Sequence, residues 1–333
     1  FLDFLRQFFD RLFPASPPAG PTPPAPPVEP VGQKPSPVVP RVLVVIYNPV
    51  VPAEGNRRLR DVLGWNDPDA LMQTYISDLR ETSGGYLNYT IAERLELDEF
   101  PVKVDGFSYT ADQYVQCMRT HMGFHQPDAL DYYRILQKFN IPARVDGGEI
   151  DEVWLFAFPY AGFYESRMGG LGAFACNSPA LTGSAAGTRR YIIMGFNYER
   201  GVGEMLESFG HRAEFILSYV FRGAGTGNLW QRFTRYEQSA PGLAEVGSIH
   251  FAPNSQVDYD WGNPRKVLSR CDTWRNFPGL AGTPRLVDSS EWGGGDTRLH
   301  HRWWLDHLPR ITGSASGIAY NWWQYIVDPN RVQ

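Results

Sequence analysis

The segment Arg41-Val-Leu-Val-Val-Ile-Tyr47 is a continuous, largely β-branched apolar run. Such a run predicts a strand that is buried on both faces, as in parallel sheets covered by helices. Similar runs follow at residues 152–158 and 191–196, and a more polar strand is expected at residues 86–97.

Helical patterns fall between the predicted strands, at residues 69–80, 110–122, 127–140 and 203–221. This alternation predicts an α/β fold with a mixed, largely parallel sheet and helices on both faces. Gly, Pro, Asn, Asp and Trp dominate after residue 221, so we expect a loop-rich C-terminal third.

The first forty residues differ from the rest in composition. Residues 1–13 predict a short amphipathic helix that contacts a membrane surface, another subunit of a homo-oligomer, or the domain itself. Residues 14–40 are rich in proline and predict a semi-rigid stalk, which leaves residues 41–333 as a single globular domain. Stalks often hold domains away from a surface, so we expect an exported protein, extracellular or in the cell envelope.

Composition excludes some partners and disulfide frameworks. The formal net charge of -5 and the lack of clustered Lys and Arg argue against nucleic acid. The aromatic content of 14% suits either a polysaccharide-contacting surface or an ordinary aromatic core. There are three cysteines and no CxxC pair; Cys117 is expected to be a buried thiol, and Cys176 and Cys271 could form a bridge.

The segment from residue 195 to residue 214 carries the most informative pattern, a strand end that runs into a helix. At helical spacing its ionisable residues share one face: Glu204, Glu207, His211 and Glu214. Glu207 and His211 are at i and i+4, the spacing by which a helix offers two ligands to one metal ion. The alternative interpretation is an ordinary solvated helix face. Gly201, Gly203 and Gly210 favour function, because glycine suits positions where another group approaches the backbone.

Gly203-Glu-Met-Leu-Glu-Ser-Phe-Gly210 resembles the active helix of zincin metallopeptidases, HExxHxxG. Gly203 stands at the first histidine of that motif and Glu207 at the second. The resemblance implies that Glu204 is the general base of a metal-dependent hydrolase.

Two later clusters add candidate ligands. The first offers nitrogen and oxygen atoms on loops, at His250, Asn254, Asp258, Asp260 and Asp272. These suit zinc if His250 joins His211, or calcium if the aspartates converge. The second predicts a pocket with polar groups on aromatic walls, from Glu291, Trp292, His300 and His307.

The sequence therefore supports two hypotheses of different kinds. The first is a surface-displayed, metal-assisted hydrolase of peptide or glycan, with Glu207, His211 and His250 as ligands and Glu204 as base. The second is a non-catalytic surface protein, either glycan-binding or self-assembling, held on its proline-rich stalk.

Overall fold

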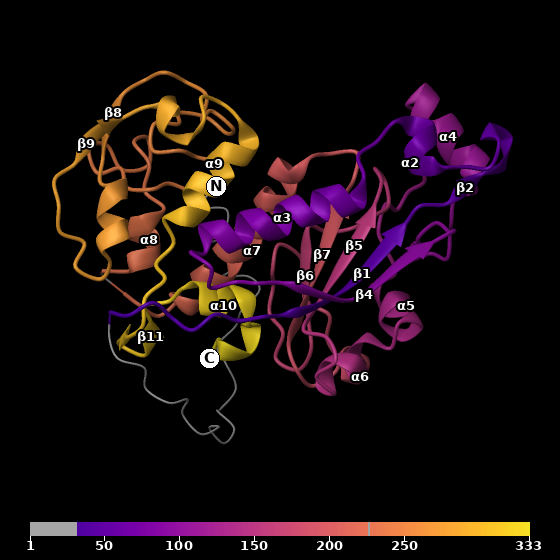
Figure 1. Cartoon of the computed structure of the whole chain (residues 1–333), viewed down its shortest axis with the longest axis horizontal. Coiled ribbons are helices and arrows are strands. Elements are labelled where there is room, and N and C mark those ends of the chain that lie inside the picture. The colour runs from indigo at the N-terminus through magenta and orange to yellow at the C-terminus, as the bar shows by residue number, and fades with distance from the viewer. Residues whose placement is uncertain (1–31, 226) are drawn as a thin grey trace.

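A five-stranded mixed sheet lies on one side of the molecule, beside the C-terminal third, and confirms the α/β prediction (Figure 1). The computed structural model describes residues 32–225 and 227–333. The strand order is β4-β1-β5-β7-β6, in which β6 runs antiparallel to β7 and the other pairs are parallel. The strands are β1 (Arg41–Tyr47), β4 (Thr90–Leu97), β5 (Glu152–Ala157), β6 (Ser166–Gly169) and β7 (Tyr191–Asn197).

Burial explains the strand sequences. All of β5 is buried, and so is β1 after its first residue, which accounts for their unbroken apolar runs. The edge strand β4 instead alternates between exposed and half-buried residues, with Glu and Arg on the solvent side. The remaining strands are short: β2 (Val50–Val51), β3 (Arg57–Arg58), β8 (Val267–Ser269), β9 (Arg285–Val287), β10 (Ser314–Ala315) and β11 (Ile318–Ala319).

Helices lie on both faces of the sheet. The chain steps from β1 to β4 in one direction and from β4 to β5 in the other, so right-handed crossovers place the intervening helices on opposite faces. The helices are α2 (Leu59–Leu63), α3 (Pro68–Thr82), α4 (Ala111–Thr120), α5 (Tyr132–Lys138), α6 (Ile141–Asp146), α7 (Val202–Val220), α8 (Leu229–Phe233), α9 (Thr297–Asp306) and α10 (Trp323–Val327). Helix α7 contacts α3 and so shares its face.

Helix α7 is buried around most of its circumference, which corrects the interpretation of a solvated charged face. Only 4% of Glu207, 7% of His211 and 2% of Glu214 is exposed. The reason is that the loop carrying Ile249, His250 and Tyr259 lies against Glu207 and Glu214, and helix α9 also packs on α7. Glycine permits part of this contact, because a Cβ on Gly210 would lie 2.4 Å from Ile249 Cδ1.

The C-terminal third is rich in loops, as predicted, and adds a cluster of aromatic side chains to the core of the domain. Its aromatic side chains pack edge to face around Phe233, which lies 5.0 Å from Trp274 and 5.7 Å from Trp304 and Trp322 between ring centroids. These rings are buried, so the core explanation of the aromatic content holds for them. The Cys176–Cys271 bridge is wrong: both thiols are free and buried, in the separate surroundings of Ser166 and Ser269.

Residues 32–40, the described end of the predicted stalk, lie along the domain. Gly32 N–H donates to Thr312 O at 2.9 Å, and Val38 N–H donates to Tyr86 O at 2.7 Å. The predicted helix of residues 1–13 and the rest of the stalk lie outside the described residues. Among the helices that are described, none combines the length and apolar character needed to cross a membrane.

Candidate metal centre

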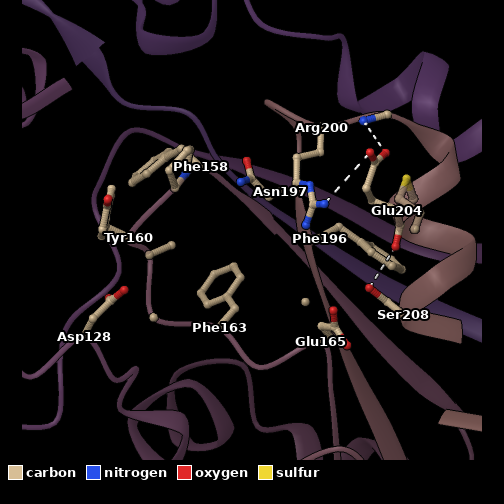
Figure 2. Close-up of a pocket in the computed structure, with 16 residues that line it drawn as sticks. Asp128, Phe158, Tyr160, Phe163, Glu165, Phe196, Asn197, Arg200, Glu204 and Ser208 are labelled. Carbon is tan, nitrogen blue, oxygen red and sulfur yellow. Dashed lines mark hydrogen bonds and ion pairs between the residues drawn. The ribbon is translucent and has the colours of Figure 1, made fainter. Parts of the chain in front are cut away.

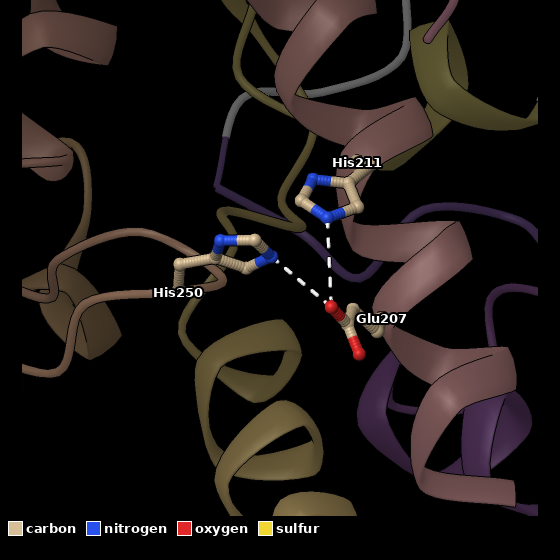
Figure 3. A group of neighbouring side chains, drawn as sticks. All are labelled: Glu207, His211 and His250. Atoms are coloured by element: carbon tan, nitrogen blue, oxygen red, sulfur yellow. Dashed lines mark hydrogen bonds and ion pairs between the residues drawn. The ribbon is translucent and has the colours of Figure 1, made fainter. Parts of the chain in front are cut away.

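Glu207, His211 and His250 come together between α7 and the loop that follows α8 (Figure 3). One ligand atom from each residue lies within 4.8 Å of the other two. Glu207 Oε1 is 3.0 Å from His250 Nε2 and 3.8 Å from His211 Nε2. Figure 3 shows both imidazoles directing a nitrogen at this one carboxylate oxygen. The three residues predicted as ligands therefore converge.

The loop that carries His250 is fixed to α7 by its neighbour Ile249. The Ile249 side chain lies against Gly210, and the Ile249 amide donates to Glu214 Oε1 at 3.0 Å. A tight turn supports the loop, in which Ser248 N–H donates to Phe251 O at 2.9 Å. Because Ile249 is docked on both sides, His250 is held within reach of Glu207.

A carboxylate lies behind each imidazole. His211 Nδ1 is 3.1 Å from Glu214 Oε2, and His250 Nδ1 is 2.9 Å from Asp258 Oδ1. Histidine ligands of metal ions almost always donate their second ring N–H to such a group, which fixes the tautomer and orients the ring. Both Nε2 atoms are thus directed at the centre of the cluster.

Tyr259 lies on the solvent-exposed side of the cluster. Its hydroxyl donates to Glu207 Oε1 at 2.6 Å, its ring centroid is 4.2 Å from that of His250, and half of the residue is exposed. Burial would raise the pKa of Glu207, but hydrogen bonds from His211, His250 and Tyr259 hold it well below its ordinary range. Glu207 therefore carries a negative charge in a buried position.

The pKa of His211 is raised within the cluster. Burial alone would lower its pKa, but hydrogen bonds to Glu207 and Glu214 raise it to about 10. With Asp258, three carboxylates surround two imidazoles, an arrangement that favours a cation.

The spacing fits a small divalent ion. Tetrahedral zinc with bonds of about 2.0 to 2.1 Å places its ligand atoms roughly 3.3 Å apart. The two measured separations from Glu207 Oε1, 3.0 and 3.8 Å, lie on either side of this value. Two nitrogens and one carboxylate oxygen form a catalytic type of ligand set, which leaves a position for water or substrate. The calcium alternative finds no support, because neither of the ligand groups among the described residues contains Asp258 or Asp260.

His300 and His301 of α9 lie beside this cluster, His307 directly follows α9, and all three are buried. His300 stacks on Trp261 with ring centroids 4.7 Å apart, and His301 Nδ1 bonds Gly203 O at 2.9 Å. Burial lowers the pKa of His301 to about 4, despite its bond to Gly203. Burial likewise lowers the pKa of His307 to about 4, and His307 Nδ1 bonds Trp303 O at 2.7 Å. All three are neutral and support the packing of α9.

The remaining candidate residues have structural partners elsewhere. Asp272 and Glu291 both pair with Arg285, and Asp260 accepts the amide of Gln256 at 3.0 Å. The indole of the buried Trp292 donates to Trp261 O at 2.6 Å. These contacts account for Asp260, Asp272, Glu291 and Trp292 as structural residues, and the pocket predicted from Glu291, Trp292, His300 and His307 stays a prediction.

A second group of potential ligands comprises Cys271, Asp272 and His307. It is less suited to a cation than the first group, because Arg285 occupies both carboxylate oxygens of Asp272. A guanidinium at that distance opposes the binding of a positive ion.

A pocket of about 250 Å³ lies beside α7, where the chain leaves β5 and β7 (Figure 2). Ligands of open α/β sheets bind at this carboxyl edge. Glu204 lines the pocket and does not belong to the metal group. Its Oε2 accepts the Gly201 amide at 3.0 Å, and its Oε1 is 4.0 Å from the Arg200 guanidinium.

Glu165 connects the pocket with the metal group. It lines the pocket, and its charge helps to raise the pKa of His211 and of Tyr259. Ser208 lines the same wall, one residue after Glu207 on α7. The pocket therefore adjoins the predicted ligands.

Comparison with known proteins identifies no relative: no family model, curated protein or solved structure matches the chain. The resemblance of residues 203–210 to the zincin helix thus stays a prediction.

Sequence reasoning missed Tyr259 and Glu165. Tyr259 could have been found from its place between Asp258 and Asp260, in a loop already singled out for its ligands. Glu165 had no such signal, because it follows β5 in a loop with no motif and is brought to α7 only by the pairing of β6 with β7.

Proposed function

We propose that this protein is a metal-dependent hydrolase in which Glu207, His211 and His250 hold a divalent transition-metal ion, zinc by preference. The observation that carries the proposal is the convergence of their ligand atoms within 4.8 Å in a buried site, with a carboxylate behind each imidazole. Hydrogen bonding alone does not require two rings to share one oxygen, whereas a metal ion requires convergent ligands.

A zinc ion bound there would supply Lewis-acid chemistry, polarising a carbonyl and making water a good nucleophile near neutral pH. Glu207, His211 and His250 would bind the ion, while Glu214 and Asp258 would orient the two imidazoles. Tyr259, half of which is exposed, would keep its hydroxyl on Glu207 Oε1 at the exposed edge of the ligand group.

Two carboxylates compete for the role of proton acceptor. Glu204 is assigned by the zincin resemblance, but its carboxylate is already bound by the Gly201 amide and lies near Arg200. Glu165 lines the same pocket and makes no ion pair within residues 32–225 and 227–333. We favour Glu165, because its carboxylate is hydrogen-bonded by the neutral Asn177 amide, whereas the Arg200 guanidinium competes with a proton for Glu204.

Metal binding tests the first part of the proposal. After chelation and reloading with zinc, elemental mass spectrometry should find one ion per chain in the wild type, and His211→Ala and His250→Ala should lose it. His125→Ala is the matched control, because that histidine pairs with Asp105 and belongs to neither ligand group among the described residues, so its loss should leave the ion bound. Equal zinc in all four proteins, or none in the wild type, would refute the proposal.

Hydrolysis tests the second part. A panel of chromogenic acyl, peptidyl and glycosyl substrates should reveal turnover that chelation abolishes and zinc restores. Glu165→Gln should keep the ion and lose turnover, and Glu204→Gln should retain most of it. The reverse pattern would assign the role of general base to Glu204. One bound ion per chain without turnover of any substrate would favour a binding protein.

A further inference from the structure

The pocket beside α7 has an aromatic end and a polar end (Figure 2). Figure 2 shows Tyr160 and Asp128 at one end, and at the other Glu204 and Ser208 on α7 with Arg200 just before that helix. Phe158 and Phe163 lie between these two ends. The lining thus combines flat rings with groups that donate and accept hydrogen bonds.

Tyr160 is held rigidly at the mouth of the pocket. Its backbone has φ +60°, a left-handed conformation that tyrosine rarely adopts. The Lys103 ammonium, 99% buried, binds Tyr160 O at 2.5 Å and thereby fixes this conformation. Phe124 stacks on the ring with centroids 3.6 Å apart and planes at 17°, yet 41% of the residue remains exposed. Strain maintained by surrounding structure is typical of functional positions.

The charges of the pocket are largely balanced. Asp128 pairs with Lys103 at 2.5 Å, and Glu204 faces Arg200. Of the charged residues that line this pocket, Glu165 alone makes no ion pair within the described part of the chain, and it accepts a hydrogen bond from the Asn177 amide. A pocket of this kind does not select a highly charged ligand, because most of its own charge is already compensated.

From these features we infer that the pocket binds a neutral sugar unit, with one face of the ring on Tyr160 and the hydroxyls on Asn197, Ser208 and Glu165. Sugar rings have apolar faces that stack on aromatic side chains and edges that require both donors and acceptors. The hydrolase substrate is then a glycan or glycoconjugate and not a peptide. That identification rests on the proposed function, whereas the binding itself does not.

Binding calorimetry tests the inference on protein from which a chelator has removed any metal ion. The probes are neutral hexasaccharides of glucose, N-acetylglucosamine, xylose and mannose, with hexa-alanine as the peptide comparison. At least one saccharide should bind the wild type with a Kd of millimolar or lower, and Tyr160→Asn should weaken it at least tenfold. Asparagine tolerates positive φ, so this variant removes the ring while keeping the backbone conformation.

Tyr133→Asn is the matched control. Tyr133 is as exposed as Tyr160, at 43%, but lies on α5 outside the pocket, so its variant should bind like the wild type. Tyr160→Phe should also retain binding, because stacking needs only the ring. Absence of saccharide binding, equal binding by Tyr160→Asn, or binding of the peptide alone would overturn the inference. Zinc content measured on the same wild-type protein tests the metal proposal separately.

Discussion

Replacing Glu214 by glutamine should weaken zinc binding although residue 214 touches no ion. Glu214 uses both oxygens, Oε1 for the Ile249 amide at 3.0 Å and Oε2 for His211 Nδ1 at 3.1 Å. Glutamine has a single oxygen, so in either orientation its NH₂ group faces one of these two N–H donors and cannot accept a hydrogen bond from it. If it faces His211, the tautomer with a free Nε2 is disfavoured; if it faces Ile249, the loop that carries His250 is loosened.

The expected size follows from comparable outer groups. Loss of a carboxylate behind a histidine ligand costs about 10- to 100-fold in metal affinity, or roughly 1.4 to 2.8 kcal/mol. Competition with a chromophoric zinc chelator at fixed pH measures this difference directly. Asp258→Asn provides the comparison: 56% of the Asp258 side chain is exposed, so water can replace it and the loss should be smaller. Zinc affinity of folded Glu214→Gln within twofold of the wild type would refute the reasoning.

Three further predictions concern stability. Gly210→Ala places a methyl group 2.4 Å from Ile249 and should lower the free energy of unfolding by about 1 to 3 kcal/mol in urea titrations; an unchanged midpoint would contradict this packing. Metal-free protein should lose stability as pH falls from 6.5 to 5, because burial lowers the pKa of His301 to about 4 and the unfolded chain takes up protons that the folded chain cannot. The cost is about 2 kcal/mol per such histidine at pH 5. His211 has a raised pKa, so its contribution to stability is lost only as pH rises toward 10 and stays constant below 6.5. Chemical denaturation at several pH values should therefore show that the free energy of unfolding falls between pH 6.5 and 5. An unchanged free energy of unfolding over this range would argue against neutral histidines on α9. Reductant should leave Tm unchanged, since all three cysteines are free; a fall in Tm on reduction would indicate a disulfide.

The central strands could be predicted from the sequence because nearly every residue in them is apolar. β1 was predicted at its observed bounds, and β5 and β7 within one residue of theirs, since strands buried on both faces can tolerate few polar side chains. β6 escaped prediction, because Ser166 and Arg167 interrupt any apolar pattern and its four residues are defined by pairing with β7.

The site was predictable for a different reason. Spacing along one helix placed Glu207 and His211 together, and only the supply of histidines in later loops suggested His250. What the sequence could not give was the surroundings of α7, since a charged helix face looks the same whether it meets water or a second layer of protein. Tertiary contacts from α9 and the 248–251 turn decided between the two.

Helix α7 packs against β6 of the sheet and against α9 and α10 of the C-terminal third, within one continuous hydrophobic core. Two of the proposed ligands, Glu207 and His211, lie on α7, and the third, His250, lies on a loop of the C-terminal third. Zinc affinity would therefore report the docking of the two halves of the chain, and during biosynthesis the ion could be captured only after both halves had been made and had assembled. A fragment that ends before residue 248 would carry the helix and two ligands but would have no complete centre to load.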